Sequence, residues 1–142
     1  MKYHIDKNGL GQGYKEEITG WGVCKGYYVN GKKNGIWNYY NKVGKILEIR
    51  YYKSGEIIKD ESYYDNGLLE LERKYKIKKG QTVIRYKSYY ENGQLLTIAK
   101  MKQDSSLSYN LHEGNYIEYY KNRKVKKKGK YKDDKQIGIW KE

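Results

Sequence analysis

Apolar and polar residues alternate along much of the chain with a period of two. The alternation is clearest in Leu47-Glu48-Ile49-Arg50-Tyr51 and in Leu69-Glu70-Leu71-Glu72. Because successive side chains of a β-strand point to opposite faces, this spacing predicts strands with one apolar and one charged face. Helical spacing is hard to find, and the absence of Pro agrees with paired interior strands. We therefore expect an all-β protein.

A Tyr-Tyr dipeptide recurs along the chain, at first every 12 residues. The pairs begin at Tyr27, Tyr39, Tyr51, Tyr63, Tyr89 and Tyr119. Such a regular recurrence indicates an internal repeat. One strand of ordinary length plus a turn occupies roughly 12 residues, so two units would make a hairpin of about 24 residues. The repeat therefore predicts successive antiparallel hairpins.

Turn signals follow most of the Tyr pairs. They are Lys53-Ser54-Gly55-Glu56, Asp65-Asn66-Gly67-Leu68 and Glu91-Asn92-Gly93-Gln94. Asn and Gly accept the positive φ values of a type I′ turn, whose twist matches the strands that it joins. We expect each Asn-Gly to lie in such a turn at a hairpin tip.

The repeat pattern suggests one domain over residues 1–142. Residues 1–19 precede the regular repeats and are expected to form an N-terminal lead-in. Residues 103–113 break the pattern, and their Asp104-Ser105-Ser106 cluster predicts an irregular insertion, either a loop or a longer hairpin.

The composition does not favour a thick hydrophobic core. Hydrophobic residues make up 37% of the chain and there is no Phe, which is less apolar than an ordinary globular domain. Disordered chains are poor in aromatic residues, however, whereas this one has 19 Tyr. A Tyr ring buries an apolar face while its hydroxyl stays hydrated, so Tyr suits a thin sheet whose faces are both close to water.

The segment Gly26–Tyr40 resembles a MORN-repeat variant, the G-x-Y-x-N-G-K-K-x-G-x-W-x-x-Y unit of bacterial proteins often labelled YwqK-type antitoxins. The segment Gly129–Trp140 is similar, with Asp133-Asp134 in place of Asn-Gly. The resemblance covers roughly residues 20 to 140, although the middle units lack the Lys-x-Gly-x-Trp half. It implies an elongated single-layer antiparallel sheet of successive MORN-like hairpins, and it implies binding rather than catalysis.

Two glycines of this unit have an expected structural role. Gly35 and Gly138 each lie two residues before a Trp. Gly within a strand often marks a close approach of a neighbouring group to the bare backbone. We expect an aromatic ring from the neighbouring strand to lie across each of them.

The chain is strongly basic, with a formal net charge of +13. That charge favours an anionic partner, such as an acidic protein or a nucleic acid. Only four of the 30 basic residues are Arg, so an AT-rich genome rich in Lys codons is an equal explanation. The shortage of Arg also counts against bidentate recognition of phosphates or guanines.

Two basic stretches are the candidate partner-binding segments. Alternation places Lys74, Lys76 and Lys78 on one face, and a turn at Lys79-Gly80 would add Arg85 and Lys87. Neighbouring like charges on a sheet are unfavourable unless an anion neutralises them. For the second stretch, residues 121–132, a solvated edge strand that lysines protect from aggregation is the favoured explanation, with partner binding as the alternative. The candidate residues are Lys74, Lys76, Lys78, Arg85, Lys87, Lys121, Arg123, Lys124, Lys126, Lys127 and Lys128.

No motif for catalysis, a cofactor or a metal is expected to function. Gly26–Lys33 resembles a phosphate-binding loop, but Lys33 replaces the Ser or Thr that would hold magnesium, and no helix pattern follows. Cys24 is the only cysteine, which leaves neither a disulfide nor a zinc-binding cluster, and we expect it to be a buried thiol. We therefore expect no enzyme activity, no cofactor, no metal and no small-molecule substrate.

The sequence favours a cytoplasmic protein without membrane contact, because no apolar stretch approaches the roughly 20 residues that span a bilayer. The leading functional hypothesis is a protein-binding module, such as an antitoxin or inhibitor of a toxin, nuclease or other effector. The alternatives are a nucleic-acid-binding sheet, with Tyr rings stacked on bases, and a phage-type inhibitor of a nucleic-acid-guided defence nuclease.

Overall fold

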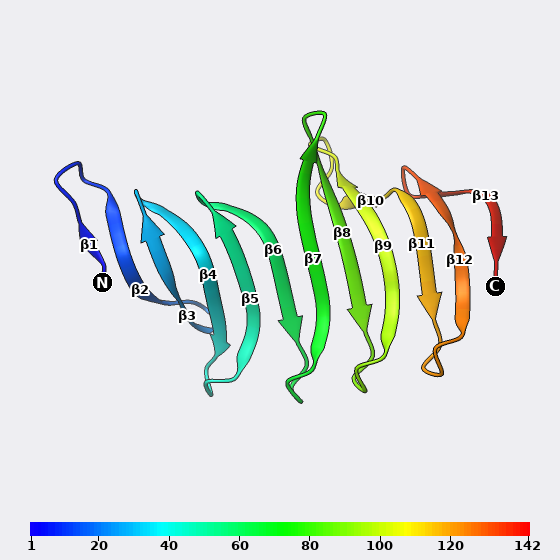
Figure 1. Ribbon diagram of the computed structural model, residues 1–142, viewed down its shortest axis with the longest axis horizontal. Helices are drawn as coiled ribbons and strands as arrows, with labels where there is room; N and C mark the ends of the chain where they lie inside the picture. The colour runs from blue at the N-terminus through cyan, green and yellow to red at the C-terminus, as the bar shows by residue number, and fades with distance from the viewer. The chain divides into compact units, whose positions relative to one another are not determined.

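The computed structural model describes residues 1–142 and contains strands and turns only (Figure 1). Strands account for 68% of the residues, which confirms the predicted all-β class. The chain divides into two compact units, unit 1 over Met1–Gly67 and unit 2 over Leu68–Glu142. Within each unit the strands form a single antiparallel layer, as the hairpin repeat predicted.

Unit 1 consists of six strands in which each pairs with the next along the chain. They are β1 (His4–Ile5), β2 (Gly11–Ile18), β3 (Gly22–Val29), β4 (Lys32–Asn41), β5 (Ile46–Lys53) and β6 (Glu56–Tyr63). The first hairpin, β1–β2, lies in the residues expected to be a lead-in.

Unit 2 contains the other seven strands. They are β7 (Leu69–Lys78), β8 (Gln81–Tyr89), β9 (Leu95–Gln103), β10 (Asn110–His112), β11 (Gly114–Tyr119), β12 (Val125–Lys132) and β13 (Lys135–Lys141). One edge of β9 pairs with β8. The other edge pairs with β11 at residues 97–98 and with β10 at residues 101–103. Residues 103–113 therefore contain a loop that returns as the short strand β10.

Four hairpins close with a two-residue turn in which both residues have positive φ. These turns are Asn30-Gly31, Ser54-Gly55, Lys79-Gly80 and Asp133-Asp134. Two consecutive positive φ values are the signature of a type I′ turn, whose twist matches the flanking strands. The Asp-Asp pair thus occupies the same conformation as the Asn-Gly pair of the first resembling segment.

Most of the other turns are wider, and for them the expected type I′ geometry is wrong. Gly67 and Gly93 have positive φ, but Asn66 and Asn92 do not. The Gly67 N–H donates to the Tyr64 carbonyl at 2.9 Å, and the other wide turns repeat this bond. Such a turn needs a left-handed residue only at its last position, where Gly forms a bulge with the returning strand.

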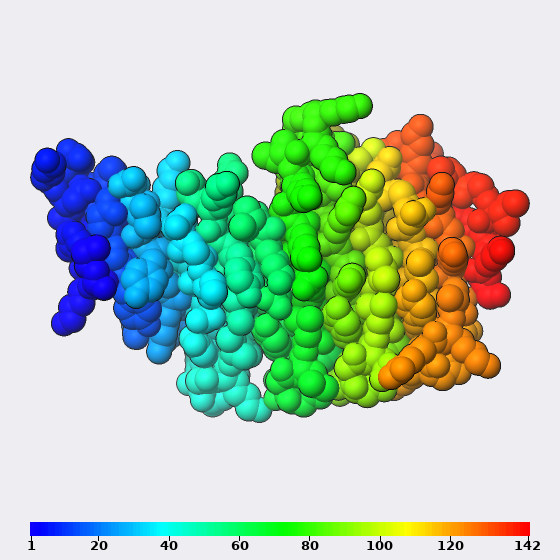
Figure 2. Space-filling model, viewed as in Figure 1, coloured from blue at the N-terminus to red at the C-terminus, as the bar shows by residue number.

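The tip of the β7–β8 hairpin projects beyond the neighbouring turns of unit 2 (Figure 2). In three other two-residue turns the second residue donates its N–H to an adjacent strand or hairpin, as Gly31 does to Gly11 and Asp134 does to His112. Gly80 makes no such bond. The tip therefore leaves Lys76, Ile77 and Lys78 exposed.

A Trp ring packed on a Gly of the neighbouring strand occurs once in each unit. Trp37 lies against Gly26, and Trp140 lies against Gly129, so closely that neither glycine has space for a Cβ. The prediction for Gly35 and Gly138 was therefore wrong, because nothing lies within 4 Å of a Cβ built on either. Both have positive φ and lie where the strand register shifts. They shape the bulge that directs the following Trp onto its glycine.

The aromatic side of each sheet forms its core. In unit 1, Trp37 is fully buried and meets the rings of Tyr28 and Tyr52 edge-on. In unit 2 a cluster of five rings is formed by His112, Tyr86, Tyr116, Tyr131 and Trp140. Because strand side chains alternate, the residues between these rings lie on the other face of unit 2.

Candidate functional site

The positive charge of the chain is concentrated in unit 2. Unit 2 contains 19 basic and 9 acidic residues, whereas unit 1 contains 11 and 8. Unit 2 thus carries +10 of the formal net charge of +13. Eight of these basic residues lie on the face of unit 2 opposite its aromatic cluster.

Strand register places three cations side by side on this face. Lys74 of β7 is directly opposite Arg85 of β8, which is directly opposite Lys100 of β9. Directly opposed residues have Cβ atoms about 4.5–5.5 Å apart and point to the same face. Arg85 thus has a cation on each side.

Further basic residues lie on the same face in neighbouring rows. Lys87 is opposite Ile98, Ile98 is opposite Ile117, and Ile117 is opposite Lys128. Alternation along β7 and β12 adds residues 76, 78 and 130. We call this surface the basic face, consisting of Lys74, Lys76, Lys78, Arg85, Lys87, Lys100, Lys128 and Lys130.

Two shallow grooves lie on the basic face. The first has a volume of about 520 Å³, and its lining includes the Lys74, Arg85 and Lys100 row. The second has a volume of about 600 Å³ and includes Lys128 and Lys130. Asn115 lines both grooves. The surface therefore combines positive charge with recesses that a partner's side chains can enter.

The Lys100 side chain lies against the backbone of Gly114. It is only partly exposed, and its Cε and Nζ lie 3.3 and 3.5 Å from the position that a Cβ on Gly114 would occupy. Its carbonyl accepts a hydrogen bond from the Glu113 N–H at 2.9 Å. The ammonium group therefore rests against glycine backbone rather than against a carboxylate.

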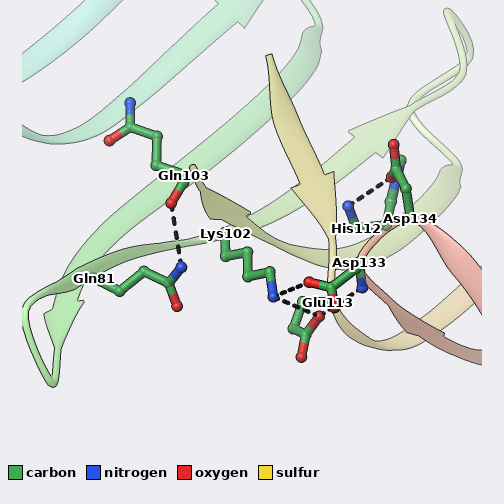
Figure 3. A network of polar contacts seen from close by, with 7 residues as sticks. All are labelled: Gln81, Lys102, Gln103, His112, Glu113, Asp133 and Asp134. Atoms are coloured by element: carbon green, nitrogen blue, oxygen red, sulfur yellow. Dashed lines mark hydrogen bonds and ion pairs between the residues drawn. The ribbon is translucent and has the colours of Figure 1, made fainter. Parts of the chain in front are cut away.

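Lys102, two residues further along β9, is neutralised by a polar network (Figure 3). Its ammonium group pairs with Asp133 and, at 3.4 Å, with Glu113. The hydrogen bond with Asp133 raises the pKa of Lys102. In the same network the backbone and ring of His112 hydrogen-bond to Asp134 and lower the pKa of its carboxyl group. This network holds the β12–β13 turn against β10 and leaves Lys102 without a free charge for a partner.

The residues predicted from the first basic stretch lie together. Lys74, Lys76 and Lys78 share one face of β7, and β8 adds Arg85 and Lys87 to it. Lys74 lies 3.9 Å from the Glu72 carboxylate, and its side chain remains 60% exposed. Neither Arg85 nor Lys87 forms an ion pair.

The residues predicted from the second basic stretch are dispersed. Lys126 pairs with Glu118 at 2.9 Å, and Lys127 lies over the Trp140 ring, so only Lys128 joins the basic face. The other three lie in the β11–β12 turn, where Arg123 donates to the Gln94 side chain. These turn residues are Lys121, Arg123 and Lys124.

Sequence reasoning missed Lys100 and Lys130 as members of the candidate site. Alternation in Ile98-Ala99-Lys100 indicated that Lys100 shares a face with Ile98. Which residues of β8 and β11 share that face depends on strand register, and the turn lengths that set the register were not predicted correctly.

Cys24 is a buried free thiol, as the sequence predicted. Cys24 is 1% exposed, its thiol lies 4.0 Å from a Glu17 carboxylate oxygen, and burial raises the pKa of the thiol. A raised pKa lowers the fraction of reactive thiolate. No group of three or more His, Cys, Asp or Glu side chains is placed to hold a metal ion.

No family model, curated protein or solved structure matches this chain. The structure also contains no helix of the length and apolar character needed to cross a membrane.

Proposed function

We propose that this protein is a non-enzymatic binding module whose basic face docks on an acidic surface of a protein partner. The observation that carries this proposal is the row formed by Lys74, Arg85 and Lys100, three cations in register on adjacent strands. Arg85 forms no ion pair, and Lys100 rests on Gly114 rather than on a carboxylate.

Such a row costs stability in the free protein. Opposite charges facing each other across strands contribute roughly 0.2–1 kcal/mol, and like charges are unfavourable by similar amounts. A partner that supplies carboxylates removes this repulsion and forms charge-assisted hydrogen bonds in its place. The energetic gain is therefore largest for an acidic partner.

Features of the basic face favour a protein over a nucleic acid. The rings of Tyr86, Tyr116 and Tyr131 belong to the aromatic cluster on the opposite face, so they are not placed beside these lysines to stack on bases. Ile98 and Ile117 provide apolar contact area between the charges. Among the eight residues of the basic face only Arg85 is an arginine, the residue that recognises phosphates and guanines bidentately.

The repeat resemblance extends the proposal to a biological role. Because Gly26–Tyr40 resembles the repeat of YwqK-type antitoxins, we propose that the chain is a MORN-repeat variant that acts as an antitoxin or inhibitor of an effector with an acidic surface. We place the encounter in the cytoplasm, where the single thiol of Cys24 is compatible with reducing conditions.

The test is affinity capture from native, nuclease-treated lysate with three versions of the folded protein. The first is the wild type, and the second neutralises the basic face with Lys74→Gln, Arg85→Gln, Lys87→Gln and Lys100→Gln. The third makes the same change of charge in unit 1, at Lys2, Lys42, Lys45 and Lys53, all of which are exposed. We expect an acidic protein to be captured by the wild type and by the unit 1 control but not by the basic-face variant.

Salt dependence and the nature of the captured molecule complete the test. Capture should weaken steeply between 50 and 300 mM salt, because the contacts are ionic and solvent-accessible. A protein retained by the basic-face variant would place the interface elsewhere. Recovery of nucleic acid alone, from lysate without nuclease, would replace the proposal with the nucleic-acid alternative.

A further inference from the structure

The first groove on the basic face has a charge balance that a single carboxylate does not neutralise. The charged side chains lining it are Glu72, Lys74, Arg85, Lys87 and Lys100. Lys87 lies directly opposite Glu72 in the strand register. Glu72 also lies 3.9 Å from the Lys74 ammonium group. Whichever lysine it offsets, the four cations and one carboxylate of the groove leave a formal net charge of +3.

The three cations differ in ways that suit one compact anion. The Lys100 side chain is already positioned at the groove, because its end lies against Gly114. Arg85, between the two lysines, offers the planar fork of donors that binds an oxyanion through two parallel hydrogen bonds. Lys74 is 60% exposed and lies 3.9 Å from Glu72, so its ammonium group can turn from this carboxylate towards a ligand from the β7 side.

On one side the charged row ends at a neutral residue. Asn115 of β11 lines the groove next to Lys100 and offers an amide rather than a fourth cation. The positive charge is therefore concentrated on three adjacent strands before Lys130 of β12 is reached. A concentrated charge favours one doubly charged group over a line of singly charged groups.

We infer that this groove is a binding site for a phosphate monoester group carried on the protein partner, held by Arg85 and Lys100 and closed by Lys74. A phosphate monoester carries a charge of about −1.5 to −2 at pH 7 and has three strong acceptor oxygens, one for each cation. A carboxylate or a nucleic-acid phosphodiester carries one charge and leaves more of the repulsion in the row. The inference rests on the proposed function, because it takes the basic face to be the surface that meets the partner.

The experiment is a titration of the full-length protein with O-phosphoserine, followed by backbone amide NMR at pH 7.5 and low ionic strength. The reference ligands are dimethyl phosphate, as a monoanionic diester, and acetate, as a carboxylate. We expect saturable shifts centred on residues 74, 85, 100 and 114. We expect phosphoserine to bind at least fivefold more tightly than either reference, because it forms additional charge-assisted bonds.

Variants assign the site to individual side chains. Arg85→Gln and Lys100→Gln should each weaken phosphoserine binding about tenfold, the effect of losing one charge-assisted bond of roughly 1.4 kcal/mol. Lys135→Gln is the control, because Lys135 is exposed in β13 and does not line the groove. It should leave the affinity within about twofold of wild type, and the amide spectrum of each variant shows directly that it is folded.

Each outcome separates this inference from the proposed function. Equal affinities for phosphoserine and dimethyl phosphate, or shifts spread over all exposed lysines, would overturn the monoester site. Loss of partner capture by the basic-face variant would still support the proposed function in that case. A preference for the diester would instead favour a nucleic-acid phosphate as the ligand. Lowering the pH to 5 should weaken phosphoserine binding, because the second phosphate proton binds with a pKa near 6.

Discussion

The indole ring of Trp37 covers Gly26 on the neighbouring strand so closely that a side chain on residue 26 has no space. The same indole is fully buried, and its Nε1–H donates to the Tyr27 carbonyl at 3.1 Å. Glycine at position 26 is therefore required by packing and not by backbone conformation, since its φ is not in the positive range.

Gly26→Ala should destabilise the protein by about 2–3 kcal/mol. The added methyl group must displace Trp37 from a well-packed position, and overpacking of this kind typically costs 1–3 kcal/mol. Urea unfolding followed by circular dichroism measures the change. Gly20→Ala is the matched control and should stay within about 0.5 kcal/mol of wild type, because nothing lies within 4 Å of a Cβ at that position. Equal effects of the two substitutions would contradict the packing argument.

Arg123→Gly should stabilise the protein by about 1 kcal/mol. Arg123 has a φ of 71° in the β11–β12 turn, at the position that Gly93 occupies in the β8–β9 turn. A left-handed conformation costs roughly 1–2 kcal/mol for a residue other than glycine. The hydrogen bond from Arg123 to Gln94 is exposed and offsets only part of this gain.

The reverse substitution, Gly93→Ala, should destabilise the protein by about 1 kcal/mol, because Gly93 has a φ of 86°. Both variants are compared with wild type by urea unfolding. The prediction fails if the two changes shift the unfolding midpoint in the same direction.

Arg85→Gln should raise stability by about 0.5 kcal/mol at low ionic strength, because the substitution removes a cation that lies between Lys74 and Lys100. Thermal unfolding at 20 and 500 mM sodium chloride measures the effect. The gain should shrink at high salt, where repulsion between exposed charges is screened. Lys25→Gln is the control with the opposite sign, because Lys25 pairs with Glu16 at 3.5 Å. A loss of stability in Arg85→Gln at low salt would show that the row is not repulsive.

Stability should fall between pH 10 and pH 12, in part because of Tyr86. Burial in the aromatic cluster raises the pKa of Tyr86 from 10.0 to about 12. Below pH 10 the Tyr86 hydroxyl is protonated in both the folded and the unfolded states, so the contribution of this buried hydroxyl to the free energy of unfolding is fully present. Between the two values the unfolded state loses its proton first, so the free energy of unfolding decreases as the pH rises.

Tyr86→Phe should flatten this decrease, because phenylalanine has no proton to lose. Urea midpoints measured from pH 9 to pH 12 give the slope for each protein. Tyr109→Phe is the control, because Tyr109 is 58% exposed and lies outside the aromatic cluster, and its slope should match that of wild type. An unchanged slope in Tyr86→Phe would assign the alkaline sensitivity to other groups.

Local sequence was sufficient to predict the hairpins and most of the residues that form them. The alternation in Leu47–Tyr51 indicated a strand, and the Asn30-Gly31 pair adopts the positive φ values that its side chains favour. Alternation also predicted that Lys74, Lys76 and Lys78 share a face. These features depend on neighbours along the chain, which the sequence displays directly.

Bulges and register required the tertiary structure. The sequence suggested that Gly35 receives a neighbouring ring, but the shift between Lys25 and Tyr27 brings Trp37 onto Gly26 instead. Asn66-Gly67 was expected in a tight turn, but it lies in a wider one with positive φ only at Gly67. One residue more or less in a turn changes the cross-strand partners of the strand that follows.

The candidate site shows the same division. The sequence by itself determined that the chain is basic and that β7 presents lysines on one face. Only the tertiary structure decided that Arg85 stands between Lys74 and Lys100, that carboxylates neutralise Lys102 and Lys126, and that the tyrosine rings of this region pack on the opposite face. The physical reason is that charge depends on composition, whereas the partners of a charge depend on which strands are paired and in which register.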